Sequence, residues 1–378
     1  MAAACSARVV DPPASDETGS LGPPADAGGD ASPDVDAGAD ASTDVGAEDA
    51  DHDADHDADG GDGAPDLGID CTTDAGHPVQ LGCTGLYSNW PTGTIAPDAR
   101  PYTPGLALWS DGAAKSRYIR LPPGARIDTS NMDEWTFPVG TKVWKEFRVG
   151  GVRVETRFLW KRGPGDWFRT TYAWSADGSS ATELTTGVQN VNGTTYEVPP
   201  QSACTACHQG RIDSVLGFEA VSLAAPGATG LTLQELVNEG LLTTPPSAPL
   251  VVPGNATESA AIGWLHANCG TACHNRSPGS LAGSTGLFMR LDVATLRSVR
   301  STDVWNTAVG QPSNFQPTPD SSLLLIAPGN PSNSAIYFRD SYRDTQGEDF
   351  QMPPLDTHVV PTAGVALVQS WILSMPSQ

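Results

Sequence analysis

Three segments between residues 142 and 174 alternate apolar and polar positions, a pattern typical of β-strands. The segments are 142–149, 152–160 and 167–174, and they are rich in aromatic and β-branched residues. Gly-Gly, Gly-Pro-Gly-Asp and Asp-Gly sequences separate or follow them, which predicts tight turns between antiparallel strands. We therefore expect an aromatic β domain over residues 71–200, folded as a β-sandwich or an open barrel. The Lys, Arg and Glu side chains of these strands are expected to form its solvated face.

Helical periodicity replaces this pattern in the C-terminal third of the chain. Thr257 can cap a helix that begins at Glu258 and leads directly into Cys269. A last helix is expected at roughly 362–374, where four apolar residues share one face: Val365, Val368, Trp371 and Ile372. The fold class that follows is α+β, with the β domain first, a connecting segment at 201–256 and a helical region at 257–378.

The charge of the chain is concentrated in its first 70 residues. Residues 1–70 contain 19 of the 44 acidic residues and one of the 21 basic ones, so the remainder has a net charge of only −5. This distribution excludes a nucleic-acid binder, because the folded part has no basic excess. Residues 11–70 consist mostly of Asp, Ala, Gly, Pro and Ser without an aromatic residue, which predicts a disordered acidic tether.

Two local patterns occur within this N-terminal region. Residues 55–66 imitate a calcium-binding loop, but Asp62 stands where an apolar residue normally anchors such a loop, so a solvated spacer is favoured. Cys5 follows three alanines and resembles the acylated cysteine of a bacterial lipoprotein, although no charged or apolar signal region precedes it. We favour a truncated start over an incidental cysteine. Membrane contact is expected only through such a lipid anchor, because no run of about 18 apolar residues is present.

The chain has seven cysteines, and four of them belong to two clusters that each end in a histidine. Of the others, Cys71 and Cys83 lie close together at the edge of the folded body and are expected to form a disulfide. If Cys5 is acylated and the clustered cysteines hold a cofactor, no thiol remains unused. This arithmetic predicts an oxidising location, in the periplasm or on the outer cell surface.

The two clusters match the attachment signature of c-type haem. The first is Cys204-Thr-Ala-Cys207-His208, in which two thiols can form thioethers with the porphyrin vinyl groups and the histidine can bind the iron. The second is Cys269-Gly-Thr-Ala-Cys273-His274, which has one additional residue between its cysteines. The longer spacing still permits haem attachment, but its loop must bulge. Two covalent haems are therefore expected.

The sequence also offers distal ligands for the irons. Met352 lies in a Gln-Met-Pro-Pro-Leu segment before the last helix, which is the order of a small cytochrome c domain, so we expect it to bind the second haem. Met289 is the rival, although its apolar surroundings indicate core packing. For the first haem the candidate is His266. Alternatively, His266 packs in the core and the first iron is open or binds water.

Zinc binding and redox dithiols are the alternatives for the clustered cysteines. Sixty-one residues separate Cys207 from Cys269, which exceeds the spacing of compact zinc modules. A thioredoxin-like dithiol would follow a strand in a βαβ unit and would not need a histidine at both clusters.

Several further segments resemble a poorly characterised family of bacterial dihaem c-type cytochromes with an N-terminal aromatic β domain. The similarity covers roughly residues 85–375 and rests on Trp109-Ser-Asp-Gly, Arg117-Tyr-Ile-Arg-Leu-Pro-Pro-Gly, Trp135-Thr-Phe-Pro-Val-Gly-Thr-Lys-Val-Trp, Glu155-Thr-Arg-Phe-Leu-Trp, Leu265-His-Ala-Asn-Cys and Gln351-Met-Pro-Pro-Leu. The resemblance implies that both Cys-His clusters attach haem, that Met352 is a distal ligand, and that the partners are redox proteins. The additional residue in the second cluster departs from the family pattern.

Three functions remain open on the sequence alone. The first is electron transfer outside the cytoplasm through two haems. The second is an oxidoreductase similar to dihaem peroxidases, with an open first haem. The third is a non-redox extracytoplasmic binding module, in which the clustered cysteines bind zinc or form disulfides.

Overall fold

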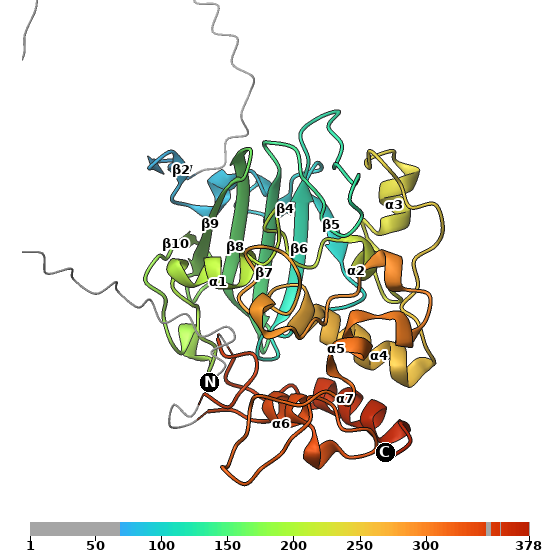
Figure 1. Ribbon diagram of the computed structural model, residues 1–378. Helices are drawn as coiled ribbons and strands as arrows, with labels where there is room; N and C mark the ends of the chain where they lie inside the picture. The colour runs from blue at the N-terminus through green and yellow to red at the C-terminus, as the bar shows by residue number, and fades with distance from the viewer. Residues whose placement is uncertain (1–68, 345–348, 356, 378) are drawn as a thin grey trace, which may run out of the picture. The chain divides into compact units, whose positions relative to one another are not determined.

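A seven-stranded antiparallel sheet forms the centre of the computed structural model, which describes residues 69–344, 349–355 and 357–377 (Figure 1). The strand order is β10-β9-β8-β7-β6-β5-β11. The strands are β5 (Arg100–Thr103), β6 (Ala114–Arg120), β7 (Lys142–Val149), β8 (Val152–Gly163), β9 (Asp166–Trp174), β10 (Ala181–Glu183) and β11 (Thr229–Gly230).

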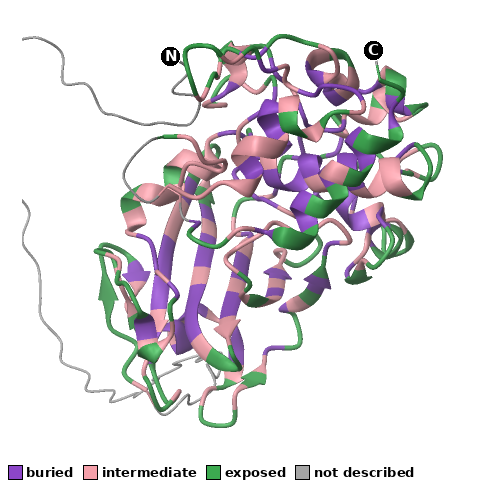
Figure 2. Ribbon diagram, turned by 90° about the horizontal axis from the view of Figure 1, so that it is seen from below, coloured by how far each residue is buried: buried purple, intermediate pink, exposed green. Residues whose placement is uncertain are grey.

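The three strands predicted from alternation are β7, β8 and β9, and their turns are as expected. Gly150 and Gly151 connect β7 to β8 with positive φ angles of 56° and 85°, which glycine adopts without steric cost. The register pairs Val143 with Leu159 and Trp144 with Phe158, so apolar side chains align on both faces of the sheet. Each strand therefore has two buried faces, and Figure 2 shows buried positions along the central strands.

One face of the sheet is covered by residues 77–99. Trp144, Phe158 and Tyr172 from the sheet form a core with Leu81 and Leu86. The covering segment contains the short strands β2 (His77–Pro78), β3 (Tyr87–Asn89) and β4 (Thr94–Ile95) and the 3₁₀ turn η1 (Leu81–Thr84); β1 (Thr73–Asp74) pairs with β2. Among the described residues, the strands thus form one large sheet and two two-stranded sheets. The covering layer is this irregular segment, where a sandwich would have a second large sheet.

The opposite face packs against segments that follow the β domain in the chain. Ile119, Val143 and Leu159 form a core there with Phe218 and Leu236. The covering helices are short: α1 (Cys204–His208), α2 (Ala220–Ala224) and α3 (Leu233–Asn238). Strand β11 from this segment pairs with β5, so residues expected to connect two domains also extend the sheet. All described residues belong to one compact unit.

The C-terminal region is helical, which together with the sheet confirms the α+β class. Its helices are α4 (Ala256–Leu265), α5 (Asp303–Ala308), α6 (Ala335–Ser341) and α7 (Thr362–Ser374). The four apolar residues predicted for one face of α7 are all buried. Helix α4 crosses α7 at Gly364, where an added Cβ would lie 2.2 Å from the Trp264 ring. The helix cap is corrected to Asn255, whose side chain accepts hydrogen bonds from the Thr257 and Glu258 amides while Glu258 bonds back.

The disulfide between Cys71 and Cys83 is present, as predicted, and links the start of the described chain to η1. A disulfide indicates an oxidising, extracytoplasmic location. In the described part of the chain, no helix combines the length and the apolar character that a membrane crossing requires. Cys5, the acidic tether and the calcium-loop-like segment at 55–66 lie outside the described residues.

Candidate functional site

Helix α1 consists of the first Cys-His cluster alone. Its single turn places Cys204, Cys207 and His208 at positions i, i+3 and i+4, which share one face of a helix. The Nδ1 atom of His208 is hydrogen-bonded to the carbonyl of Ser214, so Nδ1 carries the proton and Nε2 keeps its lone pair. Burial and the nearby cations Lys145 and Arg169 lower the pKa of His208 to about 3. The imidazole is therefore neutral, which is the form that binds a metal.

The loop that orients His208 is attached to the sheet by buried polar contacts. Ser214 has a positive φ of 57°, and its hydroxyl accepts a hydrogen bond of 2.6 Å from Arg169 on β9. The neighbouring Asp213 accepts bonds of 2.6 Å from Lys161 Nζ and 2.7 Å from Trp167 Nε1. Because Lys161 and Asp213 are both almost fully buried, this ion pair fixes the loop relative to the sheet.

The second cluster absorbs its additional residue in a π-helical turn. Helix α4 continues into the π turn η4 (His266–Gly270), and the His274 amide donates to the Cys269 carbonyl, five residues earlier, at 2.8 Å. In the first cluster cysteine and histidine are four residues apart in an α-helix. A π turn widens the backbone by about one residue, so five residues here span one turn, as four do in α1. This turn is the bulge that the longer spacing required.

His274 has the same tautomer as His208. Its Nδ1 is hydrogen-bonded to the Leu287 carbonyl at 3.3 Å, and its Nε2 has no hydrogen-bond partner within the described residues. Burial lowers the pKa of His274 to about 4 and raises the pKa of the Cys269 thiol. A backbone carbonyl bound to Nδ1 is the usual means of presenting Nε2 to a metal.

A mostly apolar cavity of about 930 Å³, partly open to solvent, lies next to the second cluster. This size is within the range of about 300–1,000 Å³ that is typical of small-molecule sites. Cys269, Cys273 and His274 line it together with Met352, so both predicted ends of one iron-binding site reach the same cavity. Further wall residues are Leu287, Met289, Phe315, Leu325, Ile336 and Arg339. Thiols, a neutral imidazole, a thioether and an apolar wall fit the requirements of a covalently attached haem.

Met352 and the rival Met289 enter this cavity from different segments. The Met289 amide donates to the His274 carbonyl at 2.8 Å, so Met289 is attached to the segment that holds the histidine. Met352 belongs to the loop after α6, and its amide donates to the Arg339 carbonyl at 2.9 Å. Axial ligands must approach an iron from opposite sides, which favours Met352. Met289 is buried in the helical core, as expected.

The loop that contains Met352 is also bound by the segment between β5 and β6. Asp111 accepts hydrogen bonds from the Thr357 hydroxyl at 2.9 Å and the His358 amide at 2.8 Å. Its neighbour Trp109 donates from its amide to Asn268, at 2.6 Å, and Asn268 directly precedes Cys269. The Trp-Ser-Asp-Gly sequence therefore connects the two chain segments that line the cavity.

The two Cys-His clusters are in direct contact. A Cβ atom added to Gly210 would lie 1.7 Å from the Ala272 carbonyl oxygen, and one added to Gly279 would lie 2.1 Å from the Gln209 carbonyl oxygen. Gly210 follows the first cluster by two residues, and Ala272 lies inside the second. Only glycine permits this approach of two backbones. Cofactors attached at both clusters would consequently be neighbours.

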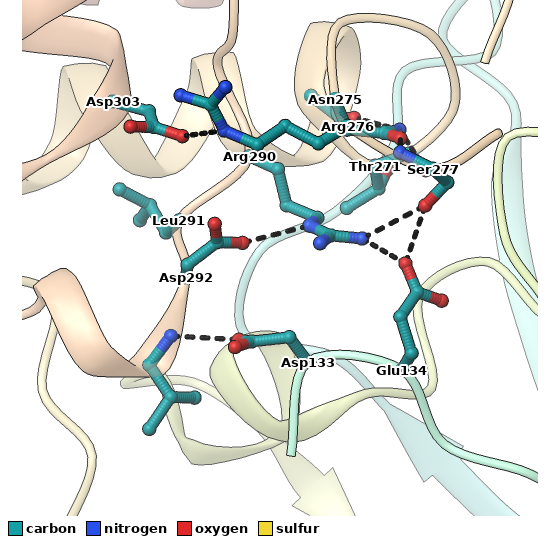
Figure 3. A network of polar contacts seen from close by, with 12 residues as sticks. Asp133, Glu134, Thr271, Asn275, Arg276, Ser277, Arg290, Leu291, Asp292 and Asp303 are labelled. Atoms are coloured by element: carbon teal, nitrogen blue, oxygen red, sulfur yellow. Dashed lines mark hydrogen bonds and ion pairs between the residues drawn. The ribbon is translucent and has the colours of Figure 1, made fainter. Parts of the chain in front are cut away.

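A buried polar network holds this junction, and Figure 3 shows its centre. Glu134, from the loop between β6 and β7, forms ion pairs with Arg211 after the first cluster and with Arg290 after the second. It also accepts a hydrogen bond of 2.6 Å from Ser277. Burial raises the pKa of Glu134, but Arg211, Ser277 and Arg290 outweigh burial and lower it overall. Sequence inspection missed Glu134, because its partners lie 77 or more residues away.

His266 has a structural position in this arrangement. Its Nδ1 accepts a hydrogen bond of 2.9 Å from the Leu291 amide, and its Nε2 lies 3.3 Å from the Glu219 carboxylate. Both ring nitrogens are therefore engaged within the protein, which agrees with the packing alternative and leaves neither for the first iron. Glu219 in turn accepts hydrogen bonds of 2.7 Å from the Val221 and Ser222 amides.

The charged strand residues do not form the solvated face that we expected. Arg117, Glu155 and Lys161 are 6%, 0% and 2% exposed, respectively, because both faces of the sheet are covered. On the face that packs against the segment containing α1, Lys145 lies close enough to Cys207 for the thiolate form to affect the pKa of the lysine. The alternation in the sequence could not reveal this burial, since the covering segments lie far along the chain.

The zinc alternative lacks support in the geometry. Across the ranges that the structure describes, no three His, Cys, Asp or Glu side chains converge to hold a metal ion. The four clustered cysteines form no disulfide with one another. Comparison with known family models, characterised proteins and solved structures found no match to the chain.

Proposed function

We propose that this protein is a dihaem c-type cytochrome that transfers electrons outside the cytoplasm. The observation that supports it most strongly is the cavity shared by Cys269, Cys273, His274 and Met352, which combines attachment and ligation chemistry. A haem bound at each cluster would supply a one-electron carrier with no substrate of its own. Redox partner proteins would deliver and remove the electrons.

The residues of the chain have distinct tasks in this proposal. Ser214 and Leu287 hold the two histidines in the tautomer that presents Nε2. The apolar wall around the second cluster excludes water, and a methionine thioether opposite histidine raises the potential of an iron. Gly210 and Gly279 bring the clusters into contact, which suits electron transfer between two cofactors.

The test is a haem count on the full-length protein, exported in a host that attaches haem. The denatured protein should give a pyridine haemochrome spectrum equivalent to two haems per chain. The paired variants C204A/C207A and C269A/C273A should each retain one haem. The matched control C71A/C83A also removes two cysteines, but it should retain both haems because these cysteines form the disulfide.

Each cluster is judged separately in this experiment. One haem in the unmodified protein, lost only in C204A/C207A, would show that the second cluster does not attach haem. Absence of haem together with bound zinc would overturn the proposal and favour the binding module.

One observation favours a second candidate, an oxidoreductase similar to dihaem peroxidases. Because both nitrogens of His266 are engaged, the residue predicted as distal ligand of the first iron is not available for it. An iron without a distal protein ligand can bind small molecules. A high-spin ferric signal that persists in C269A/C273A, with peroxide-dependent oxidation of a reduced donor, would support this candidate. A purely low-spin first haem would exclude it.

A further inference from the structure

Three cations lie side by side across neighbouring strands of the sheet. Arg117 on β6 is the direct register partner of Lys145 on β7, and Lys145 is the partner of Arg157 on β8. Directly opposed residues of a sheet share a face, and like charges in such pairs destabilise it. We call Arg117, Lys145 and Arg157 the cation row. Such a row requires a compensating negative charge.

The protein compensates only one member of the cation row. Arg157 forms an ion pair with Glu155, but that carboxylate also accepts hydrogen bonds from Thr171 and Tyr196. Arg117 is 6% exposed, and neither Arg117 nor Lys145 has an ion pair or a side-chain hydrogen bond within the described residues. A buried cation without a partner is costly. Two charges on this face thus lack an anion.

Further polar atoms near the cation row also lack partners. The Tyr102 hydroxyl, which interacts electrostatically with Arg117, is buried without a hydrogen bond, and so is Nε of Arg169. Lys115 adds another cation on β6, two residues from Arg117, and donates to the Leu108 carbonyl. Burial and neighbouring cations lower the pKa of Lys145 to about 7 and that of Lys115 to about 6. Both shifts are those of cations that lack a counter-charge.

The cation row is adjacent to the first Cys-His cluster. Lys145 interacts electrostatically with Cys207 and His208, and Arg157 interacts with His208. Arg169, at the side of the cation row, interacts with Cys204 and bonds the Ser214 hydroxyl. An anion on the cation row would therefore lie beside whatever the first cluster attaches.

We propose that the cation row is an oxyanion site, and that its occupant is the pair of propionate carboxylates of a porphyrin attached at Cys204 and Cys207. The choice of occupant rests on the proposed function, whereas the anion site itself does not. Arginine and lysine donate charge-assisted hydrogen bonds to carboxylates, and two carboxylates would balance the two uncompensated cations. A free oxyanion such as sulfate has the same chemistry and is the other source.

The first measurement separates these two sources. Millimolar sulfate, compared with chloride at equal ionic strength, should raise the unfolding midpoint of full-length C204A/C207A by about 2–4 °C, because a ligand of the folded state stabilises it. The haem-loaded protein should show no such rise, since the propionates fill the site. A rise in both proteins would assign the site to a free oxyanion.

The second measurement uses the charge itself. K145Q should lower the unfolding midpoint of the haem-loaded protein, because it removes a partner of the propionates. In the C204A/C207A background the same change should raise the midpoint, because it relieves the repulsion within the cation row, and sulfate should bind about tenfold more weakly. A lysine with a merely structural role would not give opposite signs. R117Q is the second variant of the row, in case K145Q does not fold.

The control is R162Q, which removes an exposed cation from the end of the same strand that contains Arg157. It should leave the sulfate response unchanged in both backgrounds. The proposal is overturned if C204A/C207A does not respond to sulfate, or if K145Q responds as R162Q does. A sulfate response in a protein whose first cluster attaches no haem would refute the proposed function there and leave the anion site intact.

Discussion

At the scale of single residues, each of the two cluster histidines is neutral and has one ring nitrogen bound to a backbone carbonyl. Burial lowers the pKa of His208 to about 3 and of His274 to about 4, so neither ring is protonated at neutral pH. The carbonyls of Ser214 and Leu287 determine which nitrogen is left. The chain thus provides two equivalent imidazoles on one small junction, although the clusters differ in length.

Replacing Met352 by alanine tests its role as a distal ligand. M352A should lower the potential of the second haem and let carbon monoxide bind the reduced protein, because a thioether opposite histidine favours the reduced iron and blocks the sixth position. Redox titration and carbon monoxide difference spectra measure the two effects.

The matched control is M289A, which removes the same side chain from another wall of the same cavity. M289A should lower the free energy of unfolding by about 2–5 kcal/mol, as a large-to-small core change does, without carbon monoxide binding. If M289A opens the iron and M352A does not, the two methionines must exchange roles.

Glu134 predicts a specific acid sensitivity. Its pKa in the folded state lies below its unfolded value, which is near 4.3. The stabilisation is complete above the unfolded pKa and is lost as the pH falls through the folded pKa. E134Q should therefore cost about 3–5 kcal/mol at pH 7, because it leaves Arg211 and Arg290 buried without an anion. Urea unfolding at a series of pH values measures both effects.

The control for E134Q is E235Q, a change of an exposed carboxylate on α3. E235Q should alter the free energy of unfolding by less than about 0.5 kcal/mol. Parallel pH profiles of E134Q and the unmodified protein below pH 5 would contradict the assignment.

These residues also show how far the sequence alone reaches. Cys204, Cys207 and His208 were predictable because their chemistry depends on local spacing. Glu134 and Lys145 were not, since their surroundings come from segments 60 or more residues away that no local pattern relates to them. His266 was proposed as a ligand on proximity in sequence, whereas its real neighbours are Glu219 and Leu291.

At the scale of elements, the π turn η4 makes two clusters of different length equivalent. The hydrogen bond from the His274 amide to the Cys269 carbonyl spans five residues, so the extra residue is accommodated within the helix that α4 begins. The contact between Gly210 and Ala272 then depends on the backbone of this turn.

Gly210 is therefore sensitive to the smallest side chain. G210A should lower the free energy of unfolding by about 3 kcal/mol, because its Cβ would overlap a backbone carbonyl that cannot rotate away. G163A is the control, as its Cβ would meet only Asp166 at 3.7 Å. Denaturant unfolding of both variants measures the difference, and equal stabilities would disprove the close contact of the clusters.

The disulfide predicts a stability effect that is independent of the clusters. C71S/C83S should lose about 2–4 kcal/mol, since the bond restricts the unfolded chain. A reductant should destabilise the unmodified protein by a similar amount and have no further effect on the variant. A haem content below that of the unmodified protein would contradict this independence.

Elements were predictable where their own sequence determines them. Helix α7 has the bounds that the periodicity of its apolar residues indicates, and β7–β9 follow from alternation. The second layer on the sheet was wrong as a sandwich, because residues 77–99 cover Trp144 and Phe158 with short, irregular elements that resemble strands in composition. Helix α4 begins one turn earlier than Thr257 would allow, since the Asn255–Glu258 capping box satisfies its first amides.

At the scale of the whole molecule, charge is divided between two parts of the chain. The first 70 residues have a net charge of −18, and the remaining 308 have −5. Inside the described part, however, cations collect on one sheet face beside the first cluster, while Glu134 and Asp213 bind the segments that leave it. The net charge of the folded part therefore conceals a strongly uneven internal distribution.

The Glu134 junction determines the spacing of the two clusters independently of the chain between them. Residues 209–268 connect the clusters, yet Arg211 and Arg290 are held by one carboxylate from the sheet. The exposed stretch at 243–249 is consequently a connection whose length can change without moving either cluster. Relatives of this protein are expected to vary most in length there, and the glycines at 210 and 279 are expected to persist among them.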